Sequence, residues 1–244
     1  MSDSQQTKAK GGIVDLVFLL DVSGSMQPCI DALKANIASF IDFLTTKDAN
    51  NSSPVKDWRA KVVGYRDFNY DDVPFVDNAF VRTAGELRSQ LSTLTAEGGE
   101  DEPESTLDAI YKVSTMGQTE KDASEDPIKW RYRRSAARVV VLFTDASYHE
   151  TMALPEVKGG GIQDVFNVVM SNRIVLNIFA PDMPCYDKLS QVQSSEWEAI
   201  PYDGADPEGP QKALAAYTAD HKNFTNVLKA LAKSVSSSAV VPEI

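Results

Sequence analysis

Apolar and amphipathic segments alternate along most of the chain. An almost unbroken apolar run extends from Ile13 to Leu20, with Asp15 as its only charged residue. Such a run, rich in β-branched and large aliphatic residues, is typical of a strand buried on both faces of a parallel sheet. Other apolar stretches predict strands over residues 57–68, 75–81, 137–144, 174–180 and, more weakly, 197–202. Apolar residues at helical spacing predict helices over 28–44, from about 83, after Pro103, over 162–172 and around 224–231.

Alternation of strands and helices predicts an α/β fold with helices on both faces of a mostly parallel, doubly wound sheet. Only residues 69–74 separate the second strand from the third, so these two should form an antiparallel hairpin at the sheet edge. The six-stranded order is then 3-2-1-4-5-6. The first and fourth strands are neighbours in this order, so Asp21 and Asp145 should emerge side by side at their carboxyl ends.

The first strand ends in a polar turn, residues 21–26, with the sequence Asp-Val-Ser-Gly-Ser-Met. Ligands of open α/β sheets bind at the carboxyl ends of central strands. The Asp21 carboxylate and the two serine hydroxyls are hard oxygen ligands, which suit Mg²⁺, Mn²⁺ or Ca²⁺ rather than zinc or copper. Taken alone, the turn equally fits a helix cap, because Ser23 and Ser25 are good capping residues.

Two later segments also contain acidic residues. Residues 98–104 read Gly-Gly-Glu-Asp-Glu-Pro-Glu, and residues 139–146 read Val-Val-Val-Leu-Phe-Thr-Asp-Ala. The helix dipole favours acids at a helix N-terminus, which accounts for Glu102 and Glu104 but not for four acids beside a Gly-Gly turn. The first of these segments can close over the point where the first and fourth strands end.

These three segments, in this order, resemble the opening and the metal-ion-dependent adhesion site of a von Willebrand factor type A domain. The form of the segments is similar to the branch that includes hemicentin and the α-kinase-associated domains. The likeness runs from about Gly12 to about Lys233, and three ordered motifs are much more specific than one. The resemblance implies the same strand order as the one predicted from the pattern.

The resemblance also implies a ligand set for a divalent cation. Ser23 and Ser25 would bind the metal directly, and Asp21 and Asp145 directly or through water. Many relatives supply a threonine oxygen from the Gly-Gly loop. No threonine stands there in this chain, so Asp101 is the candidate, with Glu100 as the fallback. A third acid would partly satisfy the cation and so reduce its demand for an outside carboxylate.

The function expected from this site is metal-dependent protein–protein interaction, with an Asp or Glu of a partner completing the metal shell. Such a module would be a subunit or regulator of a larger intracellular assembly. Arg66 and Asp67 follow the second strand and should lie on the metal face, either as a structural salt bridge or as a rim that contacts the partner. His149 belongs to the same rim and is expected to be a loop residue rather than a ligand, because the site is built of oxygen.

An enzyme is the alternative, namely a metal-dependent phosphatase or hydrolase with Asp21 as nucleophile. That mechanism needs a second acid two residues later, where Ser23 stands, and a lysine near the phosphate. We find no complete catalytic constellation in the sequence.

Composition and the N-terminal sequence indicate the number of domains and the expected location of the protein. The 244 residues are 43% hydrophobic and 24% charged, which is typical of one globular domain; we assign it to 12–236, with a flexible N-terminal tail at 1–11 and a C-terminal tail at 237–244. The polar N-terminus does not resemble a signal peptide, and the first apolar run is too short to span a bilayer. A cytoplasmic protein with no membrane span is therefore expected, unless a leader precedes this sequence.

A formal net charge of -11 argues against a general nucleic-acid surface, because phosphate contacts need clustered Lys and Arg. One local exception is the basic and aromatic run 129–134, which lies in what looks like an inserted surface loop, 117–135. Its shortness and its place before a strand, opposite the metal turn, favour a structural role over base stacking. Cys29 and Cys185 are expected to be ordinary thiols.

Overall fold

One mixed sheet forms the centre of the protein. The computed structural model describes residues 12–46, 55–98 and 102–238. The strands are β1 (Gly12–Asp21), β2 (Val55–Tyr65), β3 (Phe75–Asp77), β4 (Ala137–Phe143), β5 (Ile174–Pro181) and β6 (Ser195–Ile200). Their order in the six-stranded sheet is β3-β2-β1-β4-β5-β6, and only β2 and β3 pair antiparallel. The predicted topology is confirmed.

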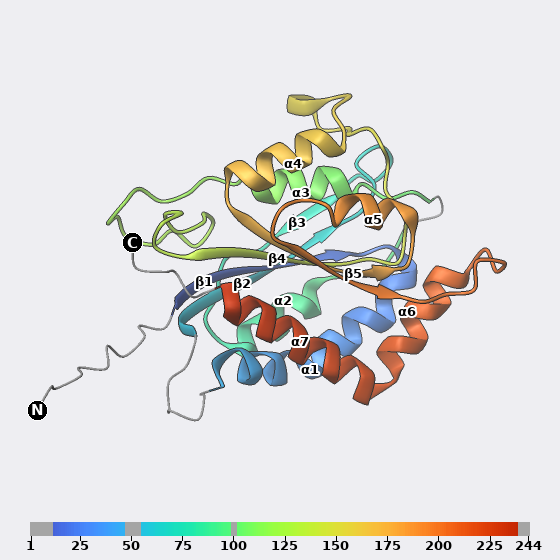
Figure 1. Cartoon of the computed structure of the whole chain (residues 1–244), viewed down its shortest axis with the longest axis horizontal. Coiled ribbons are helices and arrows are strands. Elements are labelled where there is room, and N and C mark those ends of the chain that lie inside the picture. The colour runs from blue at the N-terminus through green and yellow to red at the C-terminus, as the bar shows by residue number, and fades with distance from the viewer. Residues whose placement is uncertain (1–11, 47–54, 99–101, 239–244) are drawn as a thin grey trace, which may run out of the picture.

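Helices cover both faces of the sheet. They are α1 (Gln27–Thr45), α2 (Ala84–Thr93), α3 (Thr106–Ser114), α4 (Ile162–Ser171), α5 (Pro184–Leu189), α6 (Gly209–Ala219) and α7 (His221–Ser238), with 3-10 turns η1 (Gly24–Met26) and η2 (Pro155–Val157). Figure 1 shows α1, α2, α6 and α7 on one side of the sheet and α3, α4 and α5 on the other. None of the helices described is long and apolar enough to cross a membrane.

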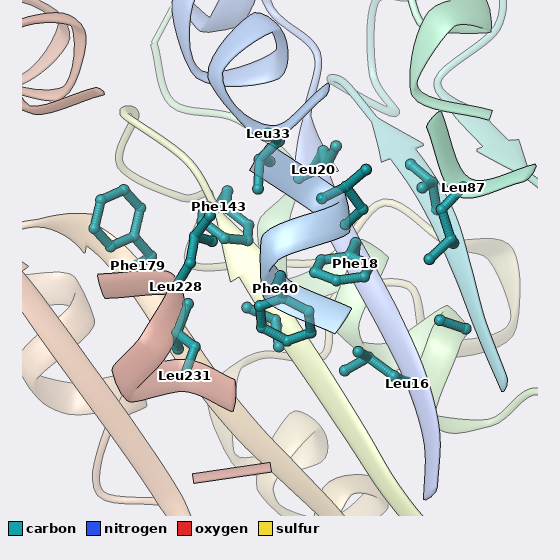
Figure 2. Packing of buried hydrophobic residues seen from close by; sticks show 14 of the residues in the cluster. Leu16, Phe18, Leu20, Leu33, Phe40, Leu87, Phe143, Phe179, Leu228 and Leu231 are labelled. Atoms are coloured by element: carbon teal, nitrogen blue, oxygen red, sulfur yellow. The ribbon is translucent and has the colours of Figure 1, made fainter. Parts of the chain in front are cut away.

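The buried strand β1 supplies side chains to both layers of the core. Leu16, Phe18 and Leu20 pack toward α1 and α7, whereas Val17 and Leu19 belong to the cluster under α3 and α4. This alternation follows from the two-residue repeat of a strand. Figure 2 shows the first cluster, in which the ring of Phe18 meets the edge of Phe40 with centroids 5.2 Å apart. The rigid core therefore fixes where the carboxyl end of β1 lies.

Some element bounds differ from the sequence prediction. β3 is shorter than the predicted 75–81, because the Asn78 side chain donates to the Val62 carbonyl (3.0 Å) where a further ladder bond would lie. α5 and α6 were not predicted. α6 buries few apolar residues besides Leu214, so its helical periodicity is weak in the sequence. Both cysteines are free, as expected.

The charged residue inside the apolar run, Asp15, is fully buried and neutralised by two arginines. Arg59 on β2 donates from Nε and Nη2 to the two carboxylate oxygens at 2.9 and 2.8 Å. Arg131 donates to the same carboxylate from Nε and from its backbone N–H, both at 2.6 Å. Asp15 therefore receives four charge-assisted or backbone hydrogen bonds, which offset the cost of burying its charge.

The segment 117–135 is an irregular and mostly exposed loop, as predicted, but its basic and aromatic run 129–134 is partly buried. The Trp130 side chain is fully buried, its Nε1 donates to the Val113 carbonyl (3.0 Å), and its ring lies 5.4 Å from that of Phe80. Arg131 is 6% exposed because it is bound to Asp15. An aromatic residue and an arginine that looked like a surface patch are thus part of the core, and neither is available to stack on a base.

We predict that Asp15→Asn destabilises the protein strongly. The amide removes the fully buried carboxylate that binds both guanidinium groups and leaves Arg131 with the partly exposed Asp57. Breaking a buried ion pair in this way costs about 3–5 kcal/mol. Urea unfolding measures the change in free energy. Asp31→Asn is the matched control, since Asp31 is exposed and only loosely paired with Lys34, and should change stability by less than about 0.5 kcal/mol. Equal stability of the two variants would contradict this account.

Candidate metal centre

The candidate site lies where β1 and β4 end. Asp21 is the last residue of β1, and Thr144 and Asp145 directly follow β4. The two strands are parallel neighbours, so these residues meet at one edge of the sheet. Thr144 Oγ1 donates to Asp21 Oδ2 at 2.8 Å, which ties the two strand ends together. In Figure 1 this edge is the one at which β1 passes into α1.

The polar turn after β1 is held by the Asp21 carboxylate. Its Oδ1 accepts the Ser23 backbone N–H at 2.9 Å. Neither Ser23 nor Ser25 caps a helix, because η1 and α1 both begin without a side-chain capping bond. Instead, the Ser25 hydroxyl donates to Asp145 Oδ1 (3.1 Å), and the two serine hydroxyl oxygens lie 3.4 Å apart. The alternative that the serine side chains cap a helix is therefore wrong. The Ser25 hydroxyl contacts Asp145, and the Ser23 hydroxyl contacts Ser25.

The third segment also reaches this point. The Gly24 N–H donates to the Gly98 carbonyl at 3.1 Å, and the Glu97 N–H donates to the Val22 carbonyl at the same distance. The start of this loop therefore contacts the turn after β1, as the sequence predicts. Asp101 and Glu100, the predicted ligands from this loop, lie outside the described residues.

The far side of the same loop is bound to the segment after β4. The Glu104 N–H donates to the Ser147 carbonyl (2.9 Å), and the Ser147 N–H donates to Glu102 Oε1 (2.7 Å). The His149 N–H donates to the Glu104 carbonyl at 3.1 Å. These bonds place Glu104 beside residues 147–149, which are more than forty positions away in the sequence.

Glu104 is a residue that the sequence reasoning missed. We had assigned it to the helix dipole, but α3 begins only at Thr106, and the Glu104 side chain is 2% exposed. An acid after a proline and before a helix resembles a surface residue in any single sequence. Only the folded chain brings Glu104 near enough to Asp21, Asp67 and Asp145 for their charges to raise its pKa.

Negative charge is poorly compensated at this site. Burial and the neighbouring Asp21 charge raise the pKa of Asp145 to about 7, although the Ser25 hydroxyl acts in the opposite direction. Burial, followed by the charges of Asp21 and Asp67, raises the pKa of Glu104 to about 9. Burial also raises the pKa of Asp21 against the hydrogen bonds from Ser23 and Thr144. A bound cation would favour the charged forms of all these carboxylates.

Two carboxylate oxygens have no hydrogen-bond donor among the described residues. They are Asp145 Oδ2 and Glu104 Oε2, and both are buried. Buried polar atoms in proteins are nearly always satisfied, so such oxygens call for an explanation. In the part of the chain that is described, no three His, Cys, Asp or Glu side chains gather closely enough to hold a metal by themselves. The donor set therefore fits a hard cation only if the serine hydroxyls take part.

The predicted rim residues are bound within the protein. Arg66 and Asp67 do not form a salt bridge with each other, because successive residues of an extended segment point in opposite directions. Arg66 Nη2 pairs with Glu97 at 3.2 Å, whereas Asp67 accepts from His149 Nε2 at 2.8 Å. Asp67 is only 5% exposed. These side chains support the loops of the site more than they present a surface.

Asp145→Asn should stabilise the protein when a chelator removes divalent ions. A raised carboxyl pKa leaves stability intact at low pH and removes it as the pH rises through about 7, since only the folded state penalises the charge. The variant should therefore unfold at a higher temperature than the wild type at about pH 8, with a smaller difference at about pH 5. Scanning calorimetry in EDTA measures both, with the exposed Asp187→Asn as control. A variant less stable than the wild type at the higher pH would contradict the charge account.

Comparisons with known proteins agree with the geometry. The sequence model of the von Willebrand factor type A domain matches residues 15–209. Among curated proteins, α-protein kinase vwkA of Dictyostelium discoideum is 28% identical over 138 residues, which are 57% of this chain and 19% of the kinase. This match agrees with the predicted likeness to the α-kinase-associated branch, and it spans only a small part of the kinase.

Solved structures give more distant similarities. Proximal thread matrix protein 1 from the mussel byssus has a TM-score of 0.49 and 12% identity, over 88% of this chain and 46% of its own. The pilus adhesin SpaC from Lactobacillus rhamnosus GG has a TM-score of 0.48 and 12% identity, over 91% of this chain and 31% of its own. The assignment rests instead on the family match over most of the chain, together with the observed sheet order. The chain belongs to the von Willebrand factor type A domain family.

Proposed function

We propose that this protein is an interaction module whose docking face is centred on one divalent cation. Domains of this family typically mediate protein–protein interactions. The single observation that supports a metal-dependent form is that Asp145 and Glu104 each bury one carboxylate oxygen that has no donor among the described residues. The Ser25 hydroxyl contacts Asp145 and lies 3.4 Å from the Ser23 hydroxyl. Oxygen ligands of this kind favour Mg²⁺, with Mn²⁺ and Ca²⁺ as the other candidates.

The residues of the turn have different roles in this proposal. Ser23 and Ser25 would supply neutral hydroxyl oxygens, and Asp145 would supply its unpartnered oxygen. Both oxygens of Asp21 accept hydrogen bonds, from the Ser23 N–H and from Thr144 Oγ1, so Asp21 would orient the turn rather than bind the ion directly. When bound, the cation would neutralise this acidic pocket and offer an open position to a carboxylate of a partner protein.

Glu104 joins Asp101 as a candidate for the remaining acidic ligand. Its Oε2 is free of hydrogen bonds, and the Asp21 and Asp145 charges both act on it. If Glu104 binds the ion as a carboxylate, it neutralises more of the cation's positive charge. The cation then binds a partner's carboxylate less tightly. Glu104→Gln and Asp101→Asn are therefore the two variants that separate these ligand sets.

The relative's name supports a role beside a larger enzyme. A region of an α-protein kinase is similar to this chain, and a module of this kind would dock or regulate such an assembly rather than carry out chemistry itself. The alternative of an Asp21 nucleophile is disfavoured, because the Asp21 side chain is fully buried and neither oxygen is open to attack a phosphate. Hydrolase turnover that disappears on Asp21→Ala would overturn this proposal.

Mg²⁺ should bind and stabilise the wild-type protein but not Asp145→Asn. Saturation to about a hundred times the dissociation constant adds about 2.7 kcal/mol to the free energy of unfolding. Calorimetric titration with Mg²⁺, Mn²⁺ and Ca²⁺ measures the affinities, and Asp187→Asn is the control for removal of an exposed acid. Equal affinity of the wild type and Asp145→Asn would place the ion elsewhere.

Partner capture tests the interaction itself. The wild type should retain a partner from cell extract in Mg²⁺ and release it in EDTA, and Asp145→Asn should retain none under either condition. The reason is that the partner's carboxylate would complete the shell of the cation rather than bind the protein alone. A partner that Asp145→Asn retains equally well in EDTA would contradict metal-dependent docking.

A further inference from the structure

Two large apolar side chains are exposed in one short loop beside the candidate site. Tyr70 is 77% and Val73 60% exposed, and both lie in the connection 66–74 between β2 and β3. Single exposed apolar residues are ordinary on protein surfaces. Ile128 and Met170 are of that kind, being 59% and 52% exposed in unrelated segments. A pair in one loop at a ligand-binding edge is a more specific feature.

This loop adjoins the polar turn directly. Arg66 Nε donates to the Val22 carbonyl at 3.2 Å. A Cβ on Gly98 would lie 3.1 Å from Asp71 Oδ1, so the loop and the Gly98 segment are in contact. Gly98 in turn accepts a hydrogen bond from Gly24 inside the turn. A segment that reaches the candidate cation would therefore pass close to this loop.

The loop is held in one conformation by the Asp67 carboxylate. Asp67 Oδ1 accepts from the Asn69 N–H (2.7 Å) and from Ser105 Oγ (3.0 Å), and Oδ2 pairs with His149 at 2.8 Å. The loop closes on itself through the Asp71 N–H to the Asp67 carbonyl (3.0 Å) and the Asp67 N–H to Asp71 Oδ2 (3.1 Å). A loop so constrained loses little conformational entropy when a partner binds it.

Acidic side chains outnumber basic ones around the apolar pair. The side chains of Asp72, Glu97 and Glu102 are exposed on this edge of the molecule. Of the two basic side chains near the loop, Arg66 is bound to Glu97 and to the Thr95 and Val22 carbonyls and is only 13% exposed. The other, Lys112, lies over the Phe68 and Phe75 rings at 5.7 and 4.8 Å. A partner segment would meet this rim favourably if it carried Lys or Arg.

We propose that Tyr70 and Val73 are the apolar anchors for a partner segment of defined chemistry. This segment contains an Asp or Glu that binds the cation, an apolar side chain that packs on Tyr70 and Val73, and flanking Lys or Arg residues that face the acidic rim. The inference rests on the proposed metal-dependent function and names the kind of partner which that site selects. Interface energy generally concentrates in a few buried aromatic and apolar contacts, which is the role assigned here to the loop.

The test uses random peptides displayed on phage, selected on the full chain in Mg²⁺ and eluted with EDTA. The selected peptides should combine an acid, an apolar residue and a basic residue. The double variant Tyr70→Ser and Val73→Ser should bind them about tenfold more weakly or worse, as expected when interface anchors are removed. The matched control, Ile128→Ser with Met170→Ser, removes two apolar side chains that are also more than half exposed but lie elsewhere, and should bind like the wild type.

The readouts separate this inference from the function on which it rests. Mg²⁺ affinity, measured by calorimetry, should be the same in the wild type and in both double variants, which also shows that the site remains folded. Peptides that need Mg²⁺ but bind the Tyr70→Ser and Val73→Ser variant as tightly as the wild type would overturn the anchor proposal alone. Selected peptides that bind Asp145→Asn in Mg²⁺ as tightly as the wild type would overturn the proposed metal site, and failure to select any EDTA-eluted peptide would overturn both proposals.

Discussion

Repulsion between buried carboxylates at the ends of β1 and β4 is the constraint on which the site depends. Parallel pairing of these strands forces Asp21 and Asp145 together, and the loop before α3 adds Glu104. Hydrogen bonds from Ser23, Ser25 and Thr144 reduce the cost but leave one oxygen each on Asp145 and Glu104 without a donor. The fold therefore holds these carboxylates close together despite their mutual repulsion, and a bound divalent cation would remove that repulsion.

Near the opposite end of β1, the negative charge of another buried acid is fully compensated. Asp15 is as deeply buried as Asp21, yet Arg59 and Arg131 satisfy both of its oxygens. One acid of β1 is therefore neutralised by the protein's own cations and supports the fold. The other acid lacks such a partner among the described residues and is available for function.

The sheet could be predicted because its pattern is local: apolar runs, helical spacing and a short hairpin connection determine the strand order. The polar turn at residues 21–26 was recognisable as a candidate site from three ordered motifs. The role of Glu104 was not, since its burial depends on residues 145–149, which contact it only in the folded chain. A structural role for the run 129–134 could be predicted, but the burial of Trp130 and Arg131 could not, because a buried counter-ion for Asp15 looks like a basic surface residue in sequence. Tyr70 and Val73 carry no sequence signal at all, because exposure is a property of the fold.

The most direct test of the uncompensated charge is the pKa of the Asp145 carboxyl itself, followed by carbon-13 NMR of labelled aspartate and assigned with Asp145→Asn. The account predicts a pKa of about 7 in the ion-free protein, against 3.8 for an ordinary aspartate, and a fall below the ordinary value when Mg²⁺ is added. An ordinary pKa that Mg²⁺ leaves unchanged would contradict it.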